Sequence, residues 1–106
     1  MARPSDPTDL VGQAEYDEEQ QRLERHAREL QIKDVRWLMA HAEGRRIVWR
    51  LLEHAGIYRT SFTGNSGTFF NEGRRDVGLF LLAEVHEAAP QAYTKMLREH
   101  WKRRDE

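Results

Sequence analysis

The sequence predicts an all-α protein, a small bundle of four to five helices with a long aromatic loop between two of them. Apolar residues recur at spacings of three and four over most of the chain, which is the period of a helix packed on one side. Helix formers such as Glu, Gln, Arg and Ala are abundant. Signals for helix ends separate the apolar segments, at Asp9, Gly56 and Pro90.

The first nine residues contain Pro4 and Pro7 among small polar residues, and we expect residues 1–9 to be a flexible arm. An acidic, exposed helix is predicted over residues 10–31, with Asp9 as its N-cap. Residues 1–30 hold eight acids and four bases, a net charge of −4. Glu18 and Arg22 stand four residues apart and should pair along this helix.

The apolar positions of this first helix are sparse, and they form a thin stripe at Tyr16, Leu23, Ala27 and Leu30. A stripe this narrow is typical of two situations. The helix is either solvated along its whole length, or it packs on another subunit. The residue pattern leaves both interpretations open.

Residues 32–106 are predicted to form a helical core domain. Its first helix spans residues 32–41, and its second ends at Gly56, which suits a left-handed C-terminal cap. A third helix over residues 73–89 is apolar on most faces, so we expect it to be the central, buried helix. Pro90 ends that helix and can open the last one at its first turn.

Between the second and third helices, residues 57–71 lose the helical period. This stretch combines aromatic residues with a Gly-Asn-Ser-Gly tip, which predicts a long loop, with a β-hairpin as the competing structure. We expect the loop to be held by its aromatic side chains, which are Tyr58, Phe62, Phe69 and Phe70.

One tetrapeptide occurs twice, each time leading into an apolar helix: Glu43-Gly44-Arg45-Arg46 and Glu72-Gly73-Arg74-Arg75. The second copy is predicted to open its helix, where positive charge opposes the helix dipole and calls for a nearby anion. Arginine forks bind carboxylates and phosphates alike. The candidates are acids of this chain, the Asp17–Glu19 segment of a neighbouring copy, or nucleic-acid phosphate. Each glycine is also a candidate for close helix approach.

Several site types are excluded by the residues present. The chain has no cysteine, which excludes disulfides, thiolate metal sites and cysteine nucleophiles. Its five histidines lack metal-ligand spacing, so no metal or other cofactor is expected. No catalytic triad or acid pair can be assembled from the motifs, and we predict that the protein is not an enzyme. No apolar run is long enough to cross a membrane.

Five segments of the chain resemble a known family, and they run from Glu43 to Leu52, Ala55 to Tyr58, Ser61 to Asn65, Phe70 to Leu79 and Pro90 to Tyr93. The family that they resemble consists of small proteins of short-tailed phages, of the Bordetella tropism-switching phage type. The resemblance covers residues 30–101 and leaves the acidic helix outside. It implies a small phage protein, encoded among head and portal genes, with no known catalytic activity.

These observations favour a virion protein that assembles in several copies, inside the head or at the portal vertex. We expect homo-oligomers, contacts with portal or core proteins, and passage through the host cytoplasm before assembly. An alternative is a DNA-handling accessory that binds phosphate through the two Gly-Arg-Arg segments. A third hypothesis is an inhibitor of a host protein that acts through the aromatic loop.

Overall fold

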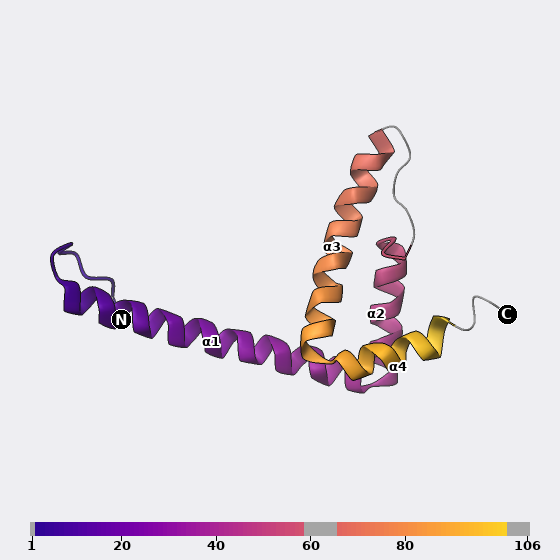
Figure 1. The fold of residues 1–106 in the computed structure, drawn as a ribbon, viewed down its shortest axis with the longest axis horizontal. Coiled ribbons are helices and arrows are strands. Elements are labelled where there is room, and N and C mark those ends of the chain that lie inside the picture. Colours follow the sequence, from indigo (N-terminus) through magenta and orange to yellow (C-terminus); the bar gives the residue numbers. More distant parts are fainter. Residues whose placement is uncertain (1, 59–65, 102–106) are drawn as a thin grey trace. The chain divides into compact units, whose positions relative to one another are not determined.

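The computed structural model describes residues 2–58 and 66–101, with the backbone alone for residues 66–70. The described residues form four helices and no strand (Figure 1), so the predicted all-α class is confirmed. The helices are α1 (Leu10–Ala40), α2 (Ala42–His54), α3 (Ser66–Ala88) and α4 (Pro90–His100). The chain divides into two compact units, Met1–Gln31 and Ile32–Glu106, and α1 crosses their boundary.

In the first unit, the start of α1 is capped as predicted. The carboxylate of Asp9 accepts a hydrogen bond from the backbone N–H of Gly12 at 2.9 Å, which satisfies one of the unpaired donors of the first turn. Ahead of the helix, Asp6 accepts a bond from the N–H of Thr8, and Gln13 donates to the carbonyl of Pro4. None of the described residues of this unit is buried, so it has no core of its own.

The helix predicted over residues 32–41 is the last part of α1, and only His41 separates α1 from α2. At His41 the backbone is extended, with φ −104° and ψ 137°. Gly44 then allows the first turn of α2 to lie against the end of α1. A Cβ at Gly44 would overlap the carbonyl group of Leu38, whose carbon would be only 2.8 Å away. Glycine is required here for close approach.

The end of α2 has the geometry that Gly56 predicts. Gly56 has φ 73°, in the left-handed region that favours glycine. Its N–H donates to the carbonyl of Glu53 at 3.0 Å, and the N–H of Ile57 donates to the carbonyl of Leu52 at 3.2 Å. This pair of bonds is the Schellman motif. Ile57 and Leu52 are both buried in the core, so the cap also fixes where the chain leaves α2.

The third helix begins earlier than expected. α3 starts at Ser66, so the predicted loop over residues 57–71 is too long, and Phe69 and Phe70 belong to the helix. Local signals are weak here because Thr, Phe, Asn and Gly are poor helix formers. Pro90 is the first residue of α4, directly after the end of α3, as predicted.

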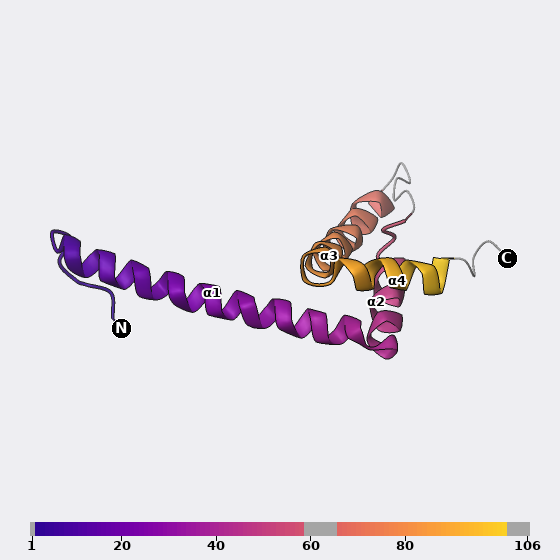
Figure 2. The ribbon, with the colours of Figure 1, turned by 60° about the horizontal axis from the view of Figure 1, so that its bottom comes forward.

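The core of the second unit is built from all four helices. Its fully buried side chains are Met39, Val48, Leu52, Val85 and Met96. Within this unit α2 and α3 lie side by side and α4 crosses them (Figure 1 and Figure 2). Gly78 permits the α2–α3 contact, because a Cβ there would lie 2.5 Å from that of Ala55.

The expectation that the third helix is the central, buried one is wrong. Val77 and Phe80 of α3 are 69% and 67% exposed, and only the face that includes Gly78 and Val85 is buried. The reason is the size of the unit. α3 has neighbours in α2 and α4, which cover one of its sides, so apolar residues elsewhere on its surface are exposed to water.

Candidate functional site: arginines at the helix ends

Among the residues that the structure describes, Arg45 is the buried charged one, and it joins three helices. Its Nε and Nη2 donate to the two carboxylate oxygens of Glu99 in α4, at 2.7 and 3.1 Å. Its Nη1 donates to the backbone carbonyl of Met39, in the last turn of α1, at 3.0 Å. Such a two-pronged pair is geometrically specific, and a lysine could not reproduce it.

The partner of Arg45 was not identified from the sequence. The sequence suggests partners among the acids next to the arginine doublets, whereas Glu99 lies 54 residues further along the chain than Arg45. The hydrogen bonds from Arg45 lower the pKa of Glu99, and they outweigh the opposing effect of burial. The bonds from Arg45 therefore favour the ionised form of this carboxylate.

Arg75 has a related role at the end of α2. Its Nη1 donates to the carbonyls of Gly56 and Ile57, at 2.8 and 2.9 Å, so a side chain of α3 binds the turn that directly follows α2. Arg36 of α1 binds the end of α3, because its Nε donates to the carbonyl of Ala88 at 3.0 Å. Cations are favourable at helix C-termini, where carbonyls lack intrahelical partners. Arg36, Arg45 and Arg75 thus each bind the end of another helix or the turn that follows it.

The other members of the two tetrapeptides lie at or near the surface. Arg46 is exposed, and its nearest acid is Glu43, also exposed, at 3.9 Å. Arg74 is half-buried and donates to the side-chain oxygen of Asn71 at 2.6 Å within α3. Glu72 is exposed. The structure thus brings Arg45 and Arg75 to helix ends, and it does not gather the four arginines at one place.

The expected position of the second doublet at the start of a helix is wrong. α3 begins at Ser66, more than two turns before Arg74, so these charges do not lie at the positive end of the dipole. It is the first tetrapeptide that opens its helix, since α2 begins at Ala42. The two glycines differ as well. A Cβ at Gly73 would meet nothing within 4 Å, in contrast to the crowded position of Gly44.

Of the four aromatic residues expected to hold the loop, Tyr58 is the one whose side chain the structure describes. It is half-buried, its ring stacks on Trp49 with centroids 5.4 Å apart, and its hydroxyl lies 2.9 Å from that of Tyr93. Burial raises the pKa of Tyr58, so the phenol stays protonated. Phe62 lies outside the described residues, and so do the side chains of Phe69 and Phe70.

Trp49 is buried and is the centre of an aromatic cluster. His100 stacks on it at 5.5 Å, and Trp101 approaches its edge at 6.0 Å. Trp101 also meets the ring of Tyr58 edge-on at 5.1 Å. The cluster fixes the end of α4 against α2, and it therefore lies next to the Arg45–Glu99 pair in sequence and structure. Packing of the rings accounts for these contacts.

Among the described residues, no group of three His, Asp or Glu side chains is arranged to hold a metal ion. In the same part of the chain, no helix is long and apolar enough to cross a membrane.

Comparison with known families identifies the group to which these helices belong. The model of the family described as Bbp19-like phage protein matches residues 35–98. The chain belongs to this family of phage proteins. The match confirms the resemblance inferred from the sequence. No curated protein and no solved structure matches the chain.

The matched segment of the Bbp19-like family corresponds to the second unit. It runs from the end of α1 through α2 and α3 into α4, and it contains both arginine tetrapeptides. It ends one residue before Glu99, and it leaves out the acidic segment over residues 10–31. The acidic segment is therefore a feature of this chain that the family match does not describe.

Proposed function

We propose that this phage protein is a non-enzymatic component of the virion, which assembles in several copies inside the head or at the portal vertex. It would act there as an internal or ejection protein, or as an accessory of the head–tail connector. The observation that carries the proposal is membership of the Bbp19-like phage family. Arg36, Arg45 and Arg75 donate to backbone carbonyls within the chain, which fits a structural role for these charges.

Mass spectrometry of purified, intact particles tests the proposal. We expect peptides of this chain in the particles, in a copy number of several per virion that matches a structural position. Particles that are infectious and lack the chain would overturn the proposal. A protein found in lysates but absent from particles would instead act during infection or assembly.

The alternative function, phosphate binding through the Gly-Arg-Arg segments, is less well supported by the geometry. Arg45 is buried, and its Nε and Nη2 already donate to the carboxylate of Glu99. These donors are therefore not available to a phosphate. Arg75 donates to the turn that follows α2. Binding to several phosphates would give an affinity that falls steeply with salt. We therefore expect that Arg74→Ala and Arg75→Ala leave any DNA binding at low salt unchanged. Gel-shift assays with these variants measure the binding.

A further inference from the structure

The acidic segment of α1 carries an apolar stripe that nothing in the first unit covers. We define the α1 stripe as Tyr16, Leu23, Ala27 and Leu30, which fall within one side of the helix at 100° per residue. Leu23 and Leu30 are 46% and 47% exposed, and no described residue of this unit is buried. A helix gains most of its stability in proteins from packing an apolar face. The α1 stripe therefore calls for a covering surface.

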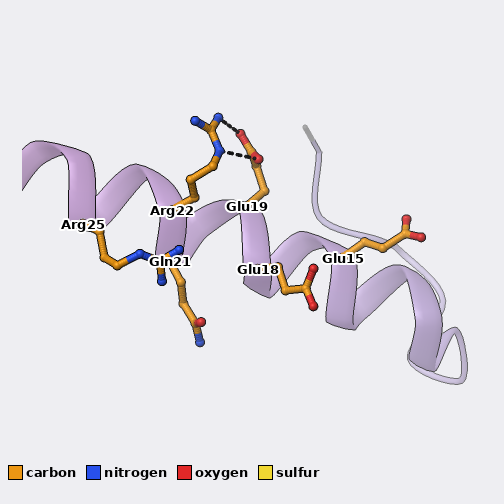
Figure 3. Close-up of a pocket in the computed structure, with 6 residues that line it drawn as sticks. All are labelled: Glu15, Glu18, Glu19, Gln21, Arg22 and Arg25. Carbon is orange, nitrogen blue, oxygen red and sulfur yellow. Dashed lines mark hydrogen bonds and ion pairs between the residues drawn. The ribbon is translucent and has the colours of Figure 1, made fainter.

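The edges of the α1 stripe are acidic. Asp17 and Glu24 border it on one side and Glu19 on the other, each within about a quarter turn of the stripe. Arg25 lies on the opposite side of the helix, and Arg22 lies beyond Glu19, about as far from the stripe as Asp17. Both line a shallow hollow with Glu15, Glu18, Glu19 and Gln21 (Figure 3). Arg22 is bound to Glu19, and not to Glu18 as the spacing predicted. Two acid-edged stripes would repel each other, which disfavours pairing of the α1 stripe with itself.

A surface of the opposite character lies on α2. We define the α2 outer face as Arg46, Ile47, Arg50, Leu51 and His54, which are all exposed and share one side of the helix. Ile47 and Leu51 are 51% and 52% exposed and border a hollow with Arg50, Glu53 and His54. Arg46 has Glu43 as its nearest acid, at 3.9 Å, which leaves it available to an incoming carboxylate.

We propose that the α1 stripe of one copy docks on the α2 outer face of a second copy, with Asp17 and Glu24 facing Arg46 and Arg50. Both halves of the complementary pair are present on the same chain: residues 1–30 carry a net charge of −4, and residues 31–106 carry +3. The inference rests on the proposed assembly in several copies and names its interface. Because two different surfaces meet, two copies can make the contact reciprocally in a closed dimer, whereas one-way contacts close into a ring or extend as a chain.

Charge-reversal variants of the full-length protein test this interface by sedimentation equilibrium at low salt. One variant carries Arg46→Glu and Arg50→Glu, and the other carries Asp17→Arg and Glu24→Arg. All four residues are exposed, so circular dichroism should show unchanged folding. We expect each variant alone to associate about tenfold more weakly or worse, since several charge pairs change from attraction to repulsion. An equimolar mixture of the two should regain association, because a contact between one copy of each variant again joins opposite charges.

The matched control reverses two exposed acids on the far side of α1, with Glu18→Arg and Glu29→Arg, and should associate as the original chain does. A chain that stays monomeric at all concentrations would overturn the inference. So would undiminished association of the α2 variant, because the α2 outer face would then take no part. The proposed function fails separately: association in solution with no chain in purified particles would overturn the virion role alone.

Discussion

Arg45 and Arg46 are neighbours in sequence, yet they have different surroundings because successive residues of a helix point about 100° apart. Arg45 faces α4 and is buried on Glu99, whereas Arg46 faces water. Arg74 and Arg75 also point in different directions. Arg75 donates to the carbonyl of Gly56 beyond α2, whereas Arg74 donates to the side chain of Asn71 within α3. One arginine of each doublet thus joins helices, and the repeated tetrapeptide does not form one binding site.

Replacing Arg45 should strongly destabilise the protein. Arg45→Met leaves the carboxylate of Glu99 partly buried without its donors and frees the carbonyl of Met39. We expect the free energy of unfolding to fall by about 2–4 kcal/mol, as for other paired charges that lose one partner inside a protein. Urea denaturation monitored by circular dichroism measures it. Arg46→Met is the control and should change stability by less than about 0.5 kcal/mol.

The same pair predicts a pH dependence. The pKa of Glu99 is lowered in the folded state by its bonds to Arg45, so its contribution is present above the ordinary pKa of 4.5. This contribution is lost as the pH falls through the lowered value. The difference in unfolding free energy between the original chain and Glu99→Gln should be constant near pH 7 and should shrink below about pH 4.5. A difference that persists unchanged at pH 3 would contradict the role of the ionised carboxylate.

At the scale of helices, the signals that sequence reasoning identified correctly are local ones. Asp9, Gly56 and Pro90 act within a few residues of the helix end that each one defines. The features that were missed depend on contacts far along the chain. Glu99 meets Arg45 across 54 residues, and the exposure of Val77 is set by which neighbours cover α3. A helical period shows that a helix has an apolar face, but not how much of it another element buries.

The two tetrapeptides offer a matched test at the same scale. Gly44→Ala should destabilise the protein, because the new Cβ would collide with the backbone carbonyl of Leu38, which cannot move without shifting α1. Gly73→Ala should stabilise it by about 0.5–1 kcal/mol, because the position is helical, exposed and open. Thermal denaturation of both variants would show the opposite signs. Equal effects would mean that the two copies have equivalent surroundings.

At the scale of the whole molecule, the core lies in the second unit alone, whereas the proposed assembly also needs the first unit. Every buried core residue lies in the second unit, which is also the part that the Bbp19-like family match covers. The first unit has an exposed helix with no core and an excess of acids. A segment of this kind adds little to the folding of the rest, and its charges and apolar stripe are accessible for association.

Removal of residues 1–31 should therefore separate the two properties. The shortened chain keeps Met39, Leu52, Val85 and Met96, so we expect it to unfold cooperatively with a melting temperature within a few degrees of the full chain. Its helical signal should fall, because residues 10–31 are helical in the full chain. Its self-association should be lost, since the α1 stripe is absent. Calorimetry and sedimentation of the same sample measure both. A large drop in melting temperature at concentrations where the full chain is monomeric would show that the acidic segment supports the core directly.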